Sequence, residues 1–416
     1  MQKRLLSLFS GAGGMDLGFE GNFSILKSHL NLNLNKEWID KEFEDTIILK
    51  KTVFKTVFAN DILKPAYSAW VPFFKSRGTA DDIYHTDSII DIVKKYHNNQ
   101  FEFPKNIDIL LGGFPCQDFS VAGKREGFNS KQGHNGKKIC NFNADNENRG
   151  QLYAWMKEVV SITKPKVFYA ENVKGLVSLG DVKNIIESDF KSIDDGYIVF
   201  SKVLKTADYG VPQNRERIIF IGLNKKYLNP KIIKLLEQNN IPEELNPFPQ
   251  ITHYDQKSKE NSIDNKFLIP YTTCSMAFQG LQEPDKTSDL SQKTYSKAKF
   301  CKGYQGNKEI ELNYIAPTIR AEHHGNIEYR RLSIENGGQY YDELNTLQER
   351  RLTIRECARL QTFPDNYEFV RRTFKNNPYP LSGSGAYKII GNAVPPLFAY
   401  HLAKRIESIW DKLFIA

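Results

Sequence analysis

Short apolar runs alternate with helical patterns along the first half of the chain. Between two of these runs, Leu152, Trp155 and Val159 recur at helical spacing within the segment Gln151–Ile162. This alternation predicts an α/β fold with a largely parallel sheet. The runs of strand length are Leu5–Phe9, Val53–Ala59, Ile107–Leu111, Lys166–Ala170, Tyr197–Leu204 and Ile218–Leu223.

The pattern changes beyond Gly222. From about Asn224 to Glu349 the chain is rich in Lys, Asn, Gln, Pro and Tyr, and no clean alternation of strand and helix continues. A second, smaller domain of irregular or β character fits this stretch better than an extension of the sheet. Helical patterns return at Thr353–Gln361 and at Pro396–Leu413.

These changes divide the sequence into two expected domains. Residues 1–225 and 386–416 would form the first domain, and residues 226–385 would form the second. Two polar stretches, Asn31–Lys51 and Asn129–Asn148, interrupt the first domain and are interpreted as insertions.

Composition narrows the class of protein only a little. The 416 residues are 40% hydrophobic and 25% charged, as in ordinary soluble proteins, and neither a membrane span nor a signal-peptide pattern is evident. We therefore expect a cytoplasmic protein. The net charge of +8 suits an anionic partner, but also an ordinary basic surface. Five scattered cysteines without a CxxC pair indicate neither a disulfide framework nor a zinc site.

A glycine-rich turn, Ser10-Gly-Ala-Gly-Gly14, follows the first predicted strand. Glycines let the backbone approach a ligand beside a helix N-terminus, although an ordinary tight turn has the same residues. A nucleoside cofactor also needs a carboxylate at the end of the next strand to bind its ribose, and Asp61 has that place. Asp87 is a candidate for the adenine amino group, or else an exposed cap of a helix Ser88–Tyr96. The pattern GxGG argues against a nicotinamide cofactor, which favours GxGxxG.

A second motif, Gly113-Phe-Pro-Cys-Gln117, follows the third predicted strand. Together with the glycine turn it resembles the C5-cytosine DNA methyltransferases of bacterial restriction-modification systems. Further segments match this family in its order: Arg149-Gly-Gln-Leu152, Glu171-Asn-Val173, Gln213-Asn-Arg-Glu-Arg217, Arg355-Glu-Cys-Ala-Arg-Leu-Gln361 with Phe363-Pro364, and Gly391-Asn-Ala-Val394. The match omits the insertions and most of the second domain. It implies a Rossmann-like, S-adenosylmethionine-dependent methyltransferase sheet with a smaller target-recognition domain.

The chemistry of such a reaction explains why a cysteine is required. Cytosine C5 is a poor nucleophile until another nucleophile adds to C6, and the cysteine thiolate is the side chain best suited to this near neutral pH. Cys116 is the expected nucleophile. Free cysteines are often buried and inert instead, but Cys116 stands in a polar Pro-Cys-Gln loop.

Addition at C6 moves negative charge toward N3, where a carboxylic acid can share or donate a proton. Glu171, at the end of a predicted strand, is the candidate, and Asn172 would orient the loop. Arg217 resembles the family's arginine that contacts cytosine O2. Arg215 would lie nearer the phosphate or the nucleophile, unless it forms a surface salt bridge.

The resemblance implies S-adenosyl-L-methionine as methyl donor and S-adenosyl-L-homocysteine as product. Asn392 and Ala393 match the segment that returns to the donor pocket; the family often has Ser in place of Ala393, so a backbone contact would survive but a hydroxyl contact would not. Phe9 would stack on the adenine and Leu152 would pack on its other side, unless both belong to the core. The expected cofactor residues are Phe9, Ser10, Gly11, Ala12, Gly13, Gly14, Asp61, Ile62, Asp87, Ser88, Gly113, Pro115, Leu152, Asn392 and Ala393.

A paired cytosine cannot be attacked within the base stack, so the target nucleotide must be flipped out. The Cys116–Arg149 loop is the expected lid, and its cations would contact phosphates. Sequence choice is expected in the second domain, which resembles enzymes that read six-base GC-rich palindromes. Its most informative stretch is Ala316–Asn326, whose paired histidines lack a surrounding metal-ligand set. The expected DNA-binding residues are Gln117, Ser120, Lys124, Arg125, Arg320, His323, His324 and Asn326.

Two rival functions share the same motifs. A tRNA cytosine methyltransferase would have a shorter second domain than Asn224–Glu349, and an inactive DNA-binding regulator would have lost Cys116, Glu171 or the glycine turn. We therefore expect a monomeric, sequence-specific enzyme acting on double-stranded DNA, with no membrane partner. It would protect DNA from a companion restriction endonuclease that acts separately.

Overall fold

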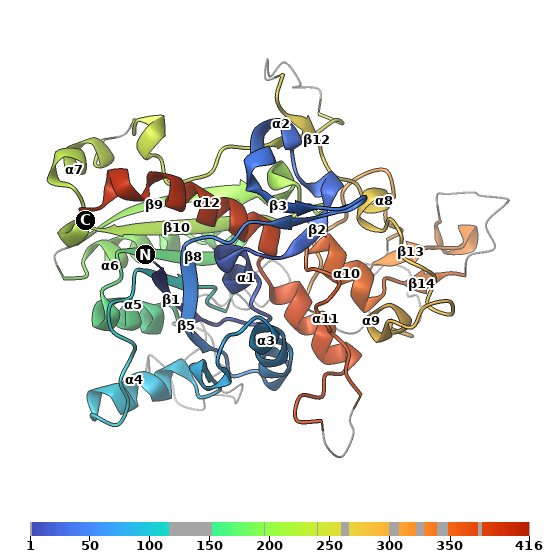
Figure 1. Ribbon diagram of the computed structural model, residues 1–416, viewed down its shortest axis with the longest axis horizontal. Coiled ribbons are helices and arrows are strands. Elements are labelled where there is room, and N and C mark those ends of the chain that lie inside the picture. The colour runs from blue at the N-terminus through green and yellow to red at the C-terminus, as the bar shows by residue number, and fades with distance from the viewer. Residues whose placement is uncertain are drawn as a thin grey trace.

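The computed structural model describes residues 2–115, 152–194, 196–238, 240–258, 266–298, 308–321, 328–338, 348–372 and 377–415. A seven-stranded sheet forms its centre (Figure 1). All pairs of neighbouring strands are parallel except those of β10, which runs antiparallel to β8 and β9. In spatial order the strands are β6 (Tyr84–His85), β5 (Phe54–Asn60), β1 (Lys3–Leu8), β7 (Ile109–Gly112), β8 (Val167–Val173), β10 (Glu216–Asn224) and β9 (Tyr197–Lys205).

The sheet confirms the predicted α/β class and its largely parallel character. Each of the six predicted strands is present, with ends shifted by a few residues. The shift matters at β8, which continues to Val173 and so includes Glu171 and Asn172 rather than ending before them. The edge strand β6 was not predicted, because two residues are too few to show a period.

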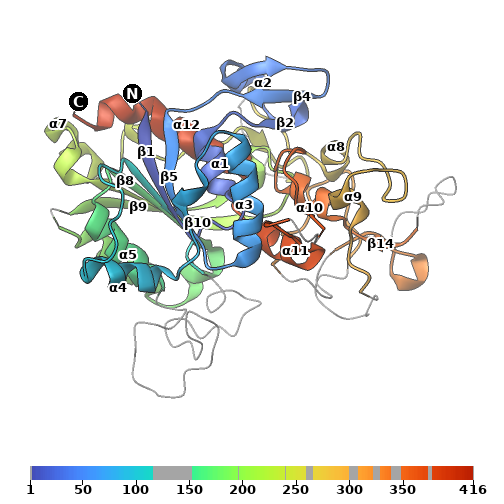
Figure 2. The same cartoon turned by 60° about the horizontal axis from the view of Figure 1, so that its bottom comes forward.

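Helices cover both faces of the sheet, because alternate strand residues point to opposite sides. Leu5 packs with α1 (Gly14–Glu20), α3 (Lys64–Ser76) and α12 (Pro396–Leu413) on one face. Leu6 and Leu8 pack with α4 (Ile89–His97), α5 (Leu152–Thr163) and α6 (Val182–Lys191) on the other. Figure 2 shows these two helical layers on either side of the strands. The predicted helix Pro396–Leu413 is confirmed at both ends.

The strand order reverses beside β1. After β1 the chain continues to β5 and β6 on one side, and then to β7 and β8 on the other. In open α/β sheets such a reversal opens a crevice at the carboxyl ends of the two central strands, and ligands bind there. The glycine turn follows β1 and Gly113–Pro115 follow β7, so both motifs reach this crevice.

The expected insertion Asn31–Lys51 is part of an ordered small sheet that begins earlier, at Ser24. Three antiparallel strands pair in the order β2 (Ser24–Leu26), β4 (Thr46–Leu49) and β3 (Ile39–Glu42), and the short helix α2 (Leu32–Asn35) lies between β2 and β3 along the chain. Ile47 and Leu49 are fully buried and belong to the same apolar core as Leu5 and α12, so this sheet packs directly onto the main core. The other expected insertion, Asn129–Asn148, lies outside the described residues.

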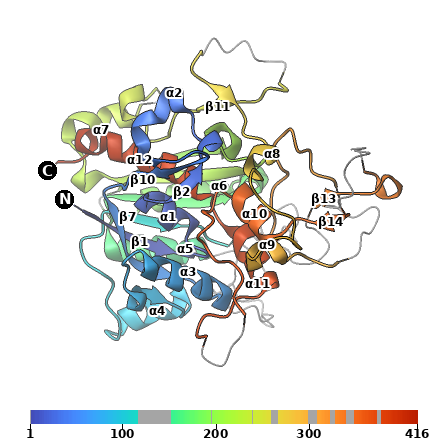
Figure 3. The same ribbon diagram turned by 45° about the vertical axis from the view of Figure 1, so that its right-hand side comes forward.

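The second half of the chain is irregular with short strands, as predicted. It contains α7 (Pro230–Leu236), α8 (Cys274–Ala277), α9 (Leu290–Lys293), the parallel pair β11 (His253–Tyr254) and β12 (Ile269–Pro270), and the antiparallel pair β13 (Tyr329–Arg331) and β14 (Arg350–Arg351). Two further helices, α10 (Ile354–Leu360) and α11 (Gly383–Asn392), lie between the central sheet and the pair β13–β14 (Figure 3).

Helix α10 confirms the predicted segment Thr353–Gln361, whose first and last residues cap it. Thr353 Oγ1 accepts a hydrogen bond from Glu356 N, and the Glu356 carboxylate accepts one from Thr353 N. Short 3-10 helices complete the fold: η1 (Lys27–His29), η2 (Lys36–Trp38), η3 (Asp81–Ile83), η6 (Lys174–Ser178), η7 (Thr206–Tyr209), η8 (Lys225–Tyr227), η9 (Glu243–Leu245) and η10 (Ile334–Asn336). Among the described residues, no helix is both long and apolar enough to cross a bilayer.

Candidate active site

The turn after β1 has a backbone that few residues other than glycine adopt. Phe9, Gly11 and Gly13 all have positive φ, at 53°, 54° and 71°. Ser10 fixes the turn to the neighbouring strand, because its N–H donates to Asn60 O at 2.9 Å and its Oγ accepts from Asn60 N at 3.1 Å. A side chain added at Gly11 would meet only Phe9 O, at 4.0 Å, so the outer side of the turn is open to a ligand.

Asp61 lies directly beside this turn. Its two carboxylate oxygens accept hydrogen bonds from Gly11 N at 3.0 Å and from Leu63 N at 2.8 Å. Burial raises the pKa of the Asp61 carboxyl to about 6, although these two hydrogen bonds and the nearby Lys388 act in the opposite direction. The exposed side chain of Ile62 is adjacent. A carboxylate beside an open glycine turn suits the hydroxyls of a ribose.

Asp87 reaches the same edge of the sheet through Asn60. The Asn60 side-chain amide donates to His85 O at 2.9 Å and to Asp87 O at 2.8 Å, which fixes the chain after β6. The alternative interpretation of Asp87 as a helix cap is wrong, because Ser88 caps α4 and accepts from Ile90 N. The exposed Asp87 carboxylate instead contacts Lys95 Nζ at 2.6 Å.

The segment after α11 packs against the glycine turn. A Cβ added at Gly14 would lie 2.1 Å from Val394 O, so only glycine allows this approach. Asn392 is exposed at the end of α11, whereas Ala393 is buried. Tyr367 supports the turn from the same side, because its hydroxyl donates to Ala12 O at 2.8 Å. Sequence reasoning missed both Asn60 and Tyr367, whose partners are backbone carbonyls remote along the chain.

Phe9 and Leu152 belong at least in part to the core. Leu152 is only 6% exposed and lies in the apolar cluster that α4 and α5 form with the sheet. Phe9 is half-buried and packs against the same cluster. Core packing therefore accounts for Leu152, while Phe9 keeps part of its surface free.

Several predicted residues lie outside the described residues. They are Cys116, Gln117, Ser120, Lys124, Arg125, His323, His324 and Asn326, together with the rest of the expected lid. The described part of the loop after β7 comprises Gly113, Phe114 and Pro115. Asn172 Nδ2 donates to Phe114 O at 3.3 Å, in agreement with its expected orienting role.

Glu171 stands next to the start of this loop and is paired with Arg217. A Cβ added at Gly113 would lie 3.2 Å from Glu171 Oε2. Arg217 Nε lies 2.7 Å from Glu171 Oε1, and the two side chains are 12% and 9% exposed. The antiparallel pairing of β8 with β10 brings them together. The structure therefore brings together three features predicted from the sequence: the start of the loop after β7, Glu171 and Arg217.

Arg215 is buried, at 1% exposure, so the alternative interpretation as a surface salt bridge is wrong. Its guanidinium Nη1 donates to Ile319 O at 3.2 Å. Arg320, the next residue, is half-buried, and its backbone rests on α11: a Cβ added at Gly391 would lie 2.1 Å from Arg320 O. The segment expected to read bases thus packs between the arginines and the helix that leads to Asn392.

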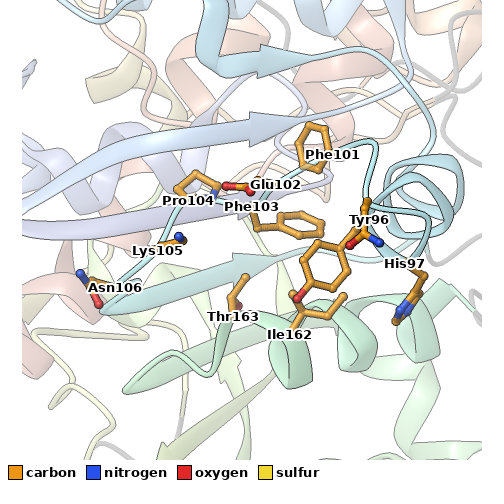
Figure 4. Close-up of a pocket in the computed structure, with 11 residues that line it drawn as sticks. Tyr96, His97, Phe101, Glu102, Phe103, Pro104, Lys105, Asn106, Ile162 and Thr163 are labelled. Carbon is orange, nitrogen blue, oxygen red and sulfur yellow. The ribbon is translucent and has the colours of Figure 1, made fainter.

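One surface cavity lies apart from this site. It has a volume of about 580 Å³ and lies between the ends of α4 and α5, with Tyr96, Phe101 and Phe103 among its lining residues (Figure 4). Asn106 on its rim precedes β7, so the cavity opens near the amino end of that strand, whereas the motifs follow the carboxyl end. Within the described ranges, no group of three His, Cys, Asp or Glu side chains is placed to hold a metal ion.

Comparison with known proteins agrees with this arrangement. The family model described as C-5 cytosine-specific DNA methylase matches residues 3–408. The Type II methyltransferase M.BsuRI of Bacillus subtilis is 31% identical over 428 residues, covering 97% of this chain and 79% of the relative. M.FnuDI of Fusobacterium nucleatum is 28% identical, covering 98% and 96%.

Solved structures show the same fold at lower identity. The Entamoeba histolytica methyltransferase EhMeth has a TM-score of 0.55 at 15% identity, and each chain is covered to 99%. A Spodoptera frugiperda DNMT2 mutant has a TM-score of 0.53 at 16% identity, covering 99% of this chain and all of that one. The family match extends over nearly the whole chain, and it agrees with the glycine turn beside Asp61 and with the Glu171–Arg217 pair beside Gly113. The chain belongs to the C-5 cytosine-specific DNA methylase family and is a DNA cytosine-C5 methyltransferase.

Proposed function

We propose that this enzyme methylates C5 of a cytosine flipped out of double-stranded DNA, with S-adenosylmethionine as donor and Cys116 as nucleophile. The observation that carries the proposal is the Glu171–Arg217 pair beside Gly113, two residues before Pro115 and three before Cys116. A cytosine held there would meet an acid for N3 and a guanidinium for O2, next to the loop that contains the thiol.

The residues around the glycine turn fit S-adenosylmethionine. Asp61 would accept hydrogen bonds from the ribose hydroxyls, and the open side of the turn at Gly11 leaves room for the ligand. Ile62 would cover one face of the adenine with its exposed side chain, and Asp87 would accept from the adenine amino group. When bound, S-adenosylmethionine supplies an electrophilic methyl group, and S-adenosylhomocysteine is the product.

The protein side chains would act in a fixed order. The Cys116 thiolate adds to C6 of the cytosine, and Glu171 supplies a proton to N3 as negative charge develops there. Arg217 holds the Glu171 carboxyl in place and contacts O2, so the ring becomes an enamine whose C5 accepts the methyl group. Solvent water then takes the C5 proton and the Glu171 carboxylate takes back the proton from N3. The electron pair of the C5–H bond forms the C5–C6 double bond and expels the sulfur from C6, which regenerates the thiolate and releases 5-methylcytosine.

Residues 1–225 and 386–416 would form the catalytic domain, and residues 226–385 the target-recognition domain. Arg320 is the base-reading candidate within the described residues, because its segment is anchored to Arg215 and to α11. The relatives named above are Type II methyltransferases. We also propose that this enzyme acts as a monomer and protects DNA from a companion endonuclease that acts separately.

Bisulfite sequencing of plasmid DNA from cells that express the chain tests the proposal. We expect conversion-resistant cytosines in one repeated sequence context, which would identify the target as well as the activity. Cys116→Ser should remove them while the protein still binds S-adenosylhomocysteine in calorimetry. Folded wild-type protein without any resistant cytosine would contradict the proposal, and retained methylation by Cys116→Ser would place the nucleophile elsewhere.

A further inference from the structure

Two fully buried glutamines form a direct contact where three segments of the chain meet. Gln213 precedes Arg215 and Arg217 at the start of β10, and Gln361 caps the C-terminus of α10; both side chains are fully buried. Gln213 Nε2 donates to Gln361 Oε1 at 3.1 Å. The residues are 148 positions apart, so this bond joins parts of the fold that the sequence keeps separate.

Each glutamine also binds a third segment. Gln213 Oε1 accepts from Ile319 N at 2.9 Å, next to the base-reading candidate Arg320. Gln361 Nε2 donates to Ile390 O at 2.7 Å and to Ala393 O at 3.3 Å, at the end of α11. The pair therefore connects the segment of Ile319 with the segment of Ala393 through two side chains.

The segments of Ile319 and Ala393 each lie next to residues proposed to bind a ligand. Ala316 N donates to Pro212 O at 3.0 Å and Asn214 N donates to Ala316 O at 2.7 Å, so backbone hydrogen bonds join the base-reading segment to the residues that lead into Arg215 and Arg217. At the other end, Val394 lies against Gly14 of the glycine turn. The two glutamines thus stand between the residues proposed for DNA and those proposed for the methyl donor.

We propose that Gln213 and Gln361 are positioning residues that couple DNA binding to cofactor binding. DNA fixes the position of the segment at Ile319, and the cofactor fixes that of the segment at Ala393. Because the two glutamines bind both segments, fixing one segment also restricts the other. Cofactor and DNA then bind more tightly together than separately, and the effect is reciprocal, as thermodynamic linkage requires. The inference rests on the proposed function, because it assumes that both ligands bind where proposed.

Glutamine suits this role because its amide both donates and accepts. A buried carbonyl left without a donor retains its full desolvation cost, so the contacts at Ile390 and Ala393 cannot be lost freely. An apolar residue of the same length would fill the space but would bind neither segment. Methionine is therefore the informative substitution at both positions.

Calorimetric titration of S-adenosylhomocysteine tests the coupling. It is done with and without a DNA duplex that contains the target sequence found by bisulfite sequencing. The ratio of the two dissociation constants is the coupling factor, and we expect about 5 or more for the wild-type protein. Gln361→Met and Gln213→Met should each bring the factor close to one. The double variant should resemble Gln213→Met, because that substitution alone removes both the bond between the glutamines and the bond from Gln213 Nε2 to Leu360 O at 3.3 Å.

Gln292→Met is the matched control. Gln292 is buried to the same degree and makes comparable bonds, donating to Gln282 O at 2.8 Å and accepting from Thr353 Oγ1 at 2.6 Å. It contacts neither α11 nor the arginine segment through these bonds, so its loss should lower stability but keep the wild-type coupling factor. Should Gln361→Met not fold, Gln213→Met breaks the same bond and leaves both contacts of Gln361 with the end of α11 in place.

The outcomes separate the two proposals. A folded Gln361→Met or Gln213→Met variant with the wild-type coupling factor would overturn the inference. A wild-type factor of one, with both ligands bound, would also overturn it while leaving the proposed function intact. Failure of the wild-type protein to bind S-adenosylhomocysteine would instead remove the proposed function, and the inference with it.

Discussion

Glu171 and Arg217 form an ion pair at the start of the loop after β7. This pairing determines how a substitution of Glu171 should affect catalysis. Gln in place of Glu171 keeps a hydrogen-bond acceptor for Arg217 Nε but cannot supply a proton to cytosine N3. Loss of a positioned general acid slows turnover by roughly 10²- to 10⁴-fold. We expect Glu171→Gln to show a loss of this size in tritiated methyl transfer to plasmid DNA.

The same variant should still bind S-adenosylhomocysteine like the wild-type protein, because Asp61 and the glycine turn follow β5 and β1, whereas Glu171 lies on β8. Turnover close to the wild-type rate would show that another group protonates N3. Loss of cofactor binding would show that Glu171 supports the whole crevice rather than one proton transfer.

Asp61 and Asp87 are chemically alike but differ in their surroundings. Asp61 is bound by two backbone N–H groups of the crevice, whereas Asp87 is exposed and paired with Lys95. A hydrogen bond to a charged group contributes about 1.5–3 kcal/mol, so Asp61→Ala should weaken S-adenosylhomocysteine more than tenfold. Asp87→Ala should weaken it less, and an unchanged affinity would leave Asp87 only a surface ion pair.

At this scale the sequence identified the motif residues but not their supports. Asp61, Glu171 and Arg217 were found because the family resemblance and the required chemistry select them. Asn60 and Tyr367 have no such signal, since each binds backbone carbonyls that any residue would offer. The sequence allowed Arg215 to be interpreted as a surface residue. Its burial depends on contact with Ile319, which lies far along the chain.

At the scale of elements, segments whose apolar positions repeat clearly were predictable, and segments whose pattern glycines interrupt were not. Helix α12 was predicted at both ends, since its apolar positions repeat over 18 residues. Helix α11 was missed, because Gly383, Gly385 and Gly391 weaken its helical pattern. Gly391 is needed where it stands, as the Arg320 backbone touches it. Tertiary contact, which a single sequence does not display, overrides propensity here.

The small sheet β2–β4 illustrates the same limit and carries a prediction. Its polar sequence suggested only an insertion, yet Asn31 is fully buried and ties the sheet to the second half of the chain. Its side-chain amide donates to Thr252 O at 2.8 Å and to Phe267 O at 2.7 Å, while its oxygen accepts from Asn33 N. These three bonds make one side chain a link between two regions.

Asn31→Ala should lower the thermal unfolding temperature by several degrees. The substitution removes three hydrogen bonds and leaves two carbonyls without this donor, at a cost of about 1–3 kcal/mol for each group that stays buried. Asn33→Ala, an exposed position in the same helix, is the control and should change the temperature little. Equal unfolding temperatures for Asn31→Ala and wild type in calorimetry would show that the sheet is not fastened through Asn31.

At the scale of the whole molecule, three buried histidines mark where its parts join. His29 comes from the small sheet region, His253 from β11 and His401 from α12. Burial lowers the pKa of His29 and His401 to about 3 and that of His253 to about 4. Arg359 lowers the pKa of His29 further, while Asp365 opposes this change. All three therefore stay neutral in the folded protein near neutral pH.

The sign of the effect on stability follows from linkage. The unfolded chain binds protons on these histidines below about pH 6.5, whereas the folded chain does not until about pH 3 or 4. Each one thus removes about 1.4 kcal/mol of stability per pH unit as the pH falls through this window. Buried carboxyls act oppositely: burial raises the pKa of Asp16 and Glu328 to about 7, so folding becomes more favourable as they are protonated.

Because these contributions oppose each other, the pH dependence of a variant relative to wild type is the quantity to measure. The His401 ring packs edge-on against Trp38 and Tyr209, and its Nε2 has no hydrogen-bond partner among the described residues, so phenylalanine fits the site without leaving a polar group unpaired. We expect His401→Phe to gain stability over wild type as the pH falls from 7.5 to 5 in urea unfolding. His97→Phe, at an exposed histidine paired with Glu158, should not. If the difference in unfolding free energy between His401→Phe and wild type stayed constant across this range, His401 would take up a proton in the folded state. Its buried surroundings would then accept a charged imidazole.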